Sequence, residues 1–309
     1  DIGTSNKRAA RGQHAQPWPA ARHQRIHDAC RYESAAASST IGPSPTSRRR
    51  RMSWSTLALR LAIAMAALFG IWRGTLLLFG AAHNPATHLL QGALISAAVL
   101  AVVALLLRCD RLRWSDAGHH AFVANLRAFL LGATLWLLPA LAGAAVCVLL
   151  GWSSISLLSS PGAMLAAIPP LVLGVFLLEA FPEELALRGY VQGLVARRAA
   201  QWIALLLQAA LFTGFAWTVG ALDSAQQWMF IPCLGLILGY VRALTGNVWA
   251  CMGVHTAWMT TAQLLSAHLA VDGLQVLQFL AFALLPSATI GATLGVLHSD
   301  FRWQRAALA

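Results

Sequence analysis

Residues 178–190 read Leu-Glu-Ala-Phe-Pro-Glu-Glu-Leu-Ala-Leu-Arg-Gly-Tyr, which places three glutamates and one arginine inside a long apolar run. An ionised carboxylate in a low-dielectric medium is costly unless it is neutralised, paired or given a chemical task. The stretch therefore predicts a helix buried in lipid that carries a functional site.

The composition of the whole chain indicates a membrane protein. Hydrophobic residues make up 58% and charged residues only 11% of the sequence, and the mean hydropathy is +0.63. Segments long enough to cross about 30 Å of hydrocarbon occur near 54–80, 89–107, 126–151, 163–182, 201–219, 227–244, 248–268 and 274–296. Their residues do not alternate as in a membrane β-barrel. We expect an all-α polytopic bundle of about eight transmembrane helices.

Residues 1–51 differ from the rest because they hold ten of the 22 Lys and Arg residues and show no apolar periodicity. Such a segment buries too little apolar area to form a packed structure. It is either a basic arm on an anionic membrane face or not part of the natural protein, which would then start at Met52; we favour the second interpretation. Most of the net charge of +11 lies there, so it does not indicate nucleic-acid binding.

We divide the remaining chain into three parts. Residues 52–118 are expected to form the first two spans and a cytoplasmic loop, and residues 119–298 a core of about six spans by the same length criterion. Residues 299–309 are expected to form a cytoplasmic tail.

The distribution of arginines predicts the orientation in the membrane. The loops near 81–88, 152–162, 220–226 and 269–273 contain no Lys or Arg, whereas the alternate loops and the tail contain Arg108, Arg111, Arg113, Arg127, Arg197, Arg198, Arg242, Arg302 and Arg305. We therefore expect a multi-pass protein of the inner (plasma) membrane with both termini in the cytoplasm.

Helical spacing assigns different tasks to the charged residues. Residues four apart share a helix face, so Glu179 lies near Glu183, and Glu184 lies near Arg188. Glu184 and Arg188 can form a dry ion pair, which leaves Glu183 as a base toward water. Alternatively, all these charges only satisfy one another where helices pack, although three carboxylates against one arginine do not balance.

A helical hairpin turning near residues 199–200 would place Glu183 level with Trp217, whose indole could donate a hydrogen bond or exclude water. His255 is the histidine inside a span near this depth, and its ring could donate to a developing oxyanion. Each of these two side chains has an alternative interpretation as an ordinary packed residue.

The segment from Glu183 to Arg188 resembles the E-E-x-x-x-R motif of the CPBP family of intramembrane endopeptidases, which includes CAAX prenyl proteases and bacteriocin-processing or immunity proteins. Residues 235–240, 245–250 and 253–258 resemble the last helices of that family, which end in H-x-x-x-N. The resemblance covers about residues 120–296. It implies that Glu183 activates water, that Glu184 and Arg188 hold the helix, and that His255 stabilises the oxyanion.

The chain departs from the family pattern at two positions. The second motif, F-x-x-x-H, has Ala216 in place of histidine if it is anchored on Phe212, or Trp217 if it is anchored on Thr213. Met259 replaces the asparagine of the last motif. We regard Glu179, Trp217 and Met259 as residues of the substrate cavity.

We expect neither a metal nor another cofactor. A catalytic zinc takes about three protein ligands, whereas Glu183, Glu184 and His255 supply one nitrogen donor.

We predict that the protein hydrolyses a peptide bond of a membrane-associated or lipidated peptide, and that a glutamate activates the water. The expected partners are the lipid bilayer and that hydrophobic peptide. One alternative is a catalytically compromised relative that binds a hydrophobic peptide or acts in immunity. A second alternative is an ion-coupled or proton-coupled membrane protein, against which the absence of internal repeats argues.

Overall fold

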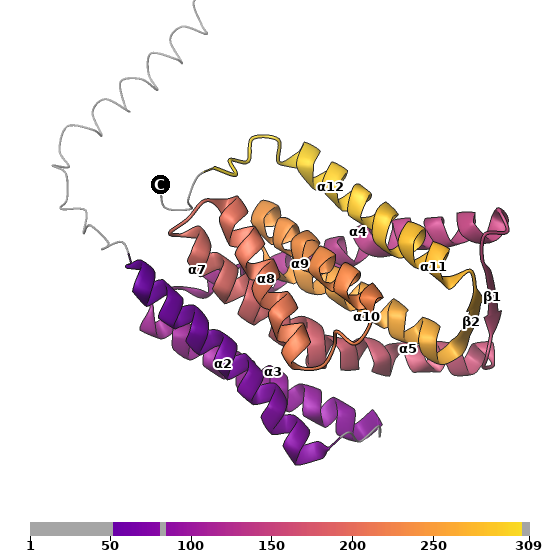
Figure 1. The fold of residues 1–309 in the computed structure, drawn as a ribbon, viewed down its shortest axis with the longest axis horizontal. Coiled ribbons are helices and arrows are strands. Elements are labelled where there is room, and N and C mark those ends of the chain that lie inside the picture. The colour runs from indigo at the N-terminus through magenta and orange to yellow at the C-terminus, as the bar shows by residue number, and fades with distance from the viewer. Residues whose placement is uncertain (1–51, 81–84, 305–309) are drawn as a thin grey trace, which may run out of the picture. The chain divides into compact units, whose positions relative to one another are not determined.

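The computed structural model describes residues 52–80 and 85–304, so the predicted arm over 1–51 and the last five residues lie outside the described part (Figure 1). The described chain is almost entirely helical. In order, its elements are α2 (Trp54–Phe79), α3 (Pro85–Cys109), η1 (Trp114–Ala117), α4 (Phe122–Leu149), β1 (Ser154–Leu157), α5 (Pro161–Val175), η2 (Phe176–Ala180), α6 (Phe181–Glu183), η3 (Glu184–Gln192), α7 (Gly193–Ala196), α8 (Gln201–Thr218), α9 (Ala225–Thr245), α10 (Val248–His268), β2 (Leu269–Asp272), α11 (Leu274–Leu277), η4 (Gln278–Leu284) and α12 (Leu285–Leu297).

Each of the eight predicted spans corresponds to a helix of the structure, which confirms the all-α polytopic bundle. In the described residues, seven helices are long and apolar enough to cross a membrane. The eighth, α10, has 21 residues but contains polar side chains such as His255 and Gln263, which lower its hydropathy. Because α10 is packed among other helices, these polar groups are kept from lipid.

The helix that carries the carboxylates is longer than predicted. The expected span 163–182 continues without a break from Pro161 to Ala196, through α5, η2, α6, η3 and α7, and we call this 36-residue segment the motif helix. At about 1.5 Å per residue it is roughly 54 Å long, so it extends beyond the hydrocarbon. Its segments η2 and η3 are π-helical and flank Glu183 on both sides. Such π-helical segments are frequent at functional sites.

Helix α10 packs against α4 at a distance that only glycine permits. A Cβ atom at Gly253 would lie 2.0 Å from the backbone oxygen of Phe129, and one at Gly132 would lie 2.0 Å from that of Ala250. Small residues at a helix interface let the backbones approach closely, and the dispersion gained there is a main source of attraction between helices in lipid. These two glycines therefore hold α10 at the centre of the bundle.

The predicted outside loops 152–162 and 269–273 meet at one end of the bundle. Their residues form β1 and β2, which pair antiparallel from Ser154 opposite Asp272 to Leu157 opposite Leu269 (Figure 1). These strands were not predicted from the sequence. Their pairing shows that the two loops lie on the same side, as the arginine distribution indicated.

The predicted inside loops meet at the other end. The Asp116 carboxylate pairs with Arg197 at 2.6 Å, and its backbone oxygen accepts a hydrogen bond from Arg242 Nη2 at 3.2 Å. Arg198 Nε donates to the backbone oxygen of Met52 at 3.1 Å. These contacts confirm that the arginine-rich loops share one side, whereas the assignment of that side to the cytoplasm stays a prediction.

Candidate functional site

Glu184 joins the motif helix to α10. Its side chain is fully buried, and Oε1 accepts hydrogen bonds from Arg188 Nη1 and from His255 Nδ1, each at 2.9 Å. Because an ionised carboxylate only accepts hydrogen bonds, the proton of this contact belongs to His255 Nδ1. The contact orients the imidazole and leaves Nε2 as the ring nitrogen available for chemistry.

The predicted ion pair between Glu184 and Arg188 is present and fully excluded from solvent. The guanidinium carbon of Arg188 lies 4.3 Å from the centroid of the Phe212 ring on α8. A cation over an aromatic face is attracted by the ring quadrupole. This contact joins the motif helix to α8. Arg188 and Phe212 lie at the same level, as a hairpin turning near residues 199–200 predicts.

Glu183 is half-buried beside this cluster. The charges of His255, Glu179, Glu184 and Arg188 all act on it, whereas no side chain of the described residues is hydrogen-bonded to it. Glu183 is therefore a carboxylate that lies within the field of the cluster and keeps its lone pairs free. Such a group can accept a proton from water.

Glu179 has a hydrogen-bond partner that was not predicted from the sequence. Its Oε1 accepts a hydrogen bond from Gln263 Nε2 at 3.1 Å. Gln263 follows His255 on α10 by about two turns at 3.6 residues per turn. A polar amide in an apolar helix is the one signal that could have indicated it, because nothing in the spacing relates Gln263 to Glu179.

Three other residues singled out in the sequence, Trp217, Ala216 and Met259, differ in how far they are buried. The side chain of Trp217 is 62% exposed, so the structure does not bring it to the buried site. Ala216 is buried beside Phe215, and it is the position at which a motif anchored on Phe212 ends. Met259 is half-buried, one turn after His255 on α10.

The expectation that this cluster holds no metal ion stays a prediction. In the described part of the chain no group of three or more His, Cys, Asp or Glu side chains is placed to hold one. Glu184 Oε1 is already shared by a guanidinium and an imidazole. Glu184 Oε2, in contrast, is buried without a hydrogen-bond partner.

An apolar cavity of about 610 Å³ opens between α4 and α5. Its wall includes Phe129 and Phe176, and Trp249 of α10 also lines it, while His119 and Asn125 supply polar groups. Phe176 begins η2, about two turns before Glu183 at 3.6 residues per turn. The cavity can accommodate an apolar group, since such sites are largely apolar with a few polar groups that set orientation.

Comparison with known proteins identifies the segment that contains this cluster. Residues 165–261 match the family model described as type II CAAX prenyl endopeptidase, Rce1-like. No curated protein and no solved structure matches the chain. The matched segment begins in α5, ends in α10, and includes Glu183, Glu184, Arg188 and His255. Residues 165–261 of this multi-pass membrane protein are thus similar to the Rce1-like type II CAAX prenyl endopeptidases, and this match supports an intramembrane endopeptidase of the CPBP family.

Proposed function

We propose that the protein hydrolyses a peptide bond of a hydrophobic or lipidated peptide in the membrane, with Glu183 as the base that activates water. One observation carries the proposal. Glu184 binds both Arg188 and His255 through Oε1, while the carboxylate of Glu183 and His255 Nε2 remain available. This arrangement provides a fixed electrophilic group next to an unbound base, which hydrolysis requires.

In the proposed reaction, Glu183 takes a proton from water and the hydroxide oxygen bonds to the carbonyl carbon of the peptide. The carbonyl oxygen becomes an oxyanion, which accepts a hydrogen bond from Nε2–H of the His255 imidazolium. The carbon–nitrogen bond then breaks, and the proton held by Glu183 passes to the leaving amine. Glu184 and Arg188 act as positioning residues, because they touch the imidazole and the motif helix rather than the substrate.

The class of substrate is proposed from the cavity and from the family match. The cavity between α4 and α5 has a volume of about 610 Å³ and is mostly apolar, which suits a hydrophobic side chain or a lipid group. In this proposal no metal takes part, because no three His, Cys, Asp or Glu side chains of the described residues are placed to hold one. We place both termini in the cytoplasm and the protein in the inner membrane, on the distribution of arginines.

A second candidate function is peptide binding without cleavage. With the family motif anchored on Phe212, Ala216 is buried at the position of its histidine, and Met259 stands where the family has asparagine. Neither side chain can donate a hydrogen bond to an oxyanion or move a proton. A relative that has lost these two groups could still hold a hydrophobic peptide against the same cluster.

The test uses the full chain in lipid nanodiscs and a prenylated peptide whose cleavage separates a fluorophore from its quencher. Wild-type protein should cleave it. Glu183→Gln should lower kcat by roughly 10²–10⁴-fold, the usual contribution of a general base. His255→Ala should lower it by roughly 10²–10³-fold, as for the loss of an oxyanion donor.

The matched control is Arg198→Gln, which removes a charge that contacts Met52 and Trp54 rather than the cluster. It should keep wild-type activity. Cleavage that survives Glu183→Gln unchanged would remove Glu183 from the mechanism. If the wild type binds the peptide without cleaving it, and the combination of Ala216→His with Met259→Asn cleaves it, the second candidate function is correct.

A further inference from the structure

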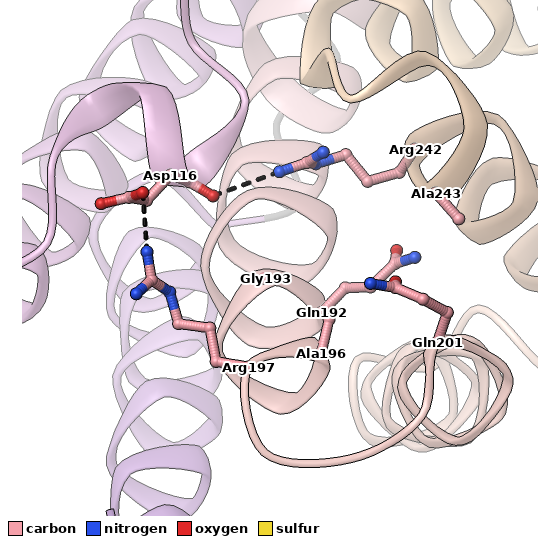
Figure 2. A pocket seen from close by; sticks show the side chains of 8 residues that line it. All are labelled: Asp116, Gln192, Gly193, Ala196, Arg197, Gln201, Arg242 and Ala243. Atoms are coloured by element: carbon pink, nitrogen blue, oxygen red, sulfur yellow. Dashed lines mark hydrogen bonds and ion pairs between the residues drawn. The ribbon is translucent and has the colours of Figure 1, made fainter. Parts of the chain in front are cut away.

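A polar pocket of about 250 Å³ lies at the loop end of the motif helix, on the side where the arginine-rich loops meet (Figure 2). Its lining includes Asp116 of η1, Gln192 and Arg197 near the end of the motif helix, Gln201 at the start of α8, and Arg242 of α9. It is at the opposite end of the motif helix from β1. The peptidase reaction proposed above uses none of these side chains.

The charges around the pocket do not balance. Two arginines face one aspartate, and the Asp116 carboxylate is engaged by Arg197 at 2.6 Å. Arg242 reaches only the backbone oxygen of Asp116, at 3.2 Å, and among the described residues it forms no ion pair (Figure 2). Its Nε is buried without an acceptor. Arg242 is half-buried and has no anionic partner among the described residues, so the pocket keeps a positive charge that an anion would complement.

Arg242 is also held in position by the backbone beside it. Gly118 has a φ of +78°, and a Cβ atom there would lie 2.8 Å from Arg242 Cζ. Only glycine therefore leaves room for the guanidinium between η1 and α10. An arginine restrained in this way loses little further freedom when it binds an anion.

Two further groups complement an anion that also carries a hydroxyl. Gln201 is the first residue of the 18-residue helix α8 and lines the pocket, so the positive end of the helix dipole adjoins it. The N-cap residue, Ala200, supplies no side-chain acceptor for the free N–H groups at this end. Gln192 is 2% exposed and donates through Nε2 to the backbone oxygen of Gly239 at 2.8 Å. Its Oε1 is buried without a donor, and a hydroxyl hydrogen would satisfy it.

We propose that this pocket binds a phosphate group that bears a hydroxyl, either hydrogenphosphate or the phosphoglycerol headgroup of an anionic lipid. Arg242 and Arg197 contact the phosphate oxygens, and Gln192 Oε1 accepts the hydroxyl. The bound group links η1, the motif helix, α8 and α9 at this end of the bundle, and it stabilises the folded protein by mass action.

The test measures thermal unfolding of the full chain in detergent micelles. One arm compares sodium phosphate with sodium chloride at equal ionic strength, and the other compares micelles supplemented with phosphatidylglycerol or with phosphatidylcholine. Phosphate or phosphatidylglycerol should raise the Tm of the wild type. Arg242→Gln and Gln201→Glu should each weaken that binding at least about tenfold, since charge-assisted hydrogen bonds are lost or a repulsive charge is added.

Arg198→Gln serves as the matched control, because it removes an equal charge next to Arg197 but outside the pocket. It should keep the wild-type response. Should Arg242→Gln fail to fold, Gln201→Glu alone decides, because this half-buried side chain at the helix start accepts the change without loss of volume. A response in the phosphate arm identifies hydrogenphosphate, and one confined to phosphatidylglycerol identifies the lipid. No response in either arm, or equal responses in wild type and Gln201→Glu, would overturn the proposal.

Discussion

Replacing Arg188 by methionine tests whether the buried ion pair holds the site together. The side chains of Arg188 and Glu184 are both fully excluded from solvent, and their atoms lie 2.9 Å apart. Methionine has a similar length and no charge, so Glu184 would remain buried with His255 as its sole charged partner among the described residues. The guanidinium would also leave the face of Phe212.

The expected loss of unfolding free energy is about 3–5 kcal/mol, the usual cost of removing one partner from a buried pair. At roughly 2–4 °C per kcal/mol for a domain of this size, the Tm in detergent should fall by roughly 6–20 °C. The matched control is Arg60→Met. Arg60 pairs with Asp110 at 3.0 Å, but its side chain is 26% exposed and Asp110 also accepts from Tyr190. This control should cost about 1 kcal/mol or less.

A double variant distinguishes charge from packing. Glu184→Leu combined with Arg188→Met removes both charges, and such apolar replacements of buried pairs are often neutral or stabilising. The double variant should therefore recover most of the Tm lost in Arg188→Met, while His255 loses its carboxylate partner and activity stays low. If Arg188→Met is as stable as Arg60→Met, the ion pair does not hold the helices and the reasoning fails.

Three other predictions follow from the packing and the topology. Ala216→His should raise peptidase activity because residue 216 is buried, whereas Trp217→His should not, because that side chain is 62% exposed; equal rates would mean that burial does not decide the effect. Gly253→Ala should cost about 1–3 kcal/mol or more through overpacking against α4, with Gly70→Ala, which has no neighbouring atom within 4 Å, as the control measured by the same thermal unfolding. Reporter fusions in the loops that form β1 and β2 should read external, and fusions in η1 or directly after α9 internal; a mixed result within either pair would reject the orientation.

The spans and the sides of the loops could be predicted from the sequence because the membrane imposes simple local rules. A helix must present about 20 apolar residues to lipid, and this length rule located all eight helices. The arginine bias groups loops by side without any knowledge of their contacts. The contacts of Asp116 with Arg197 and Arg242, and the pairing of β1 with β2, agree with that grouping.

The ion pair between Glu184 and Arg188 could also be predicted, because helical spacing places residues four apart on one face. The hairpin that turns near residues 199–200, in contrast, predicts which residues of its two helices lie at the same depth, but it does not predict which way their side chains point around the helix axis. It predicted the level of residues 216 and 217, but it could not decide which of them points inward. The structure buries Ala216 and exposes Trp217, because rotation depends on how α8 packs against its neighbours.

From the sequence alone one could therefore predict the membrane environment, the helices, the grouping of the loops by side and the charged motif within one helix. All of these depend on residues close together in the chain. The contacts between distant residues, in contrast, required the fold: His255 donates to Glu184 across 71 positions of sequence, Gln263 donates to Glu179, and Arg242 lies in a pocket without an anionic partner for it among the described residues. The physical reason is that a hydrogen bond depends on distances of a fraction of an ångström and on direction. Those distances follow from glycine contacts between helices and from π-helical turns, which no local pattern records.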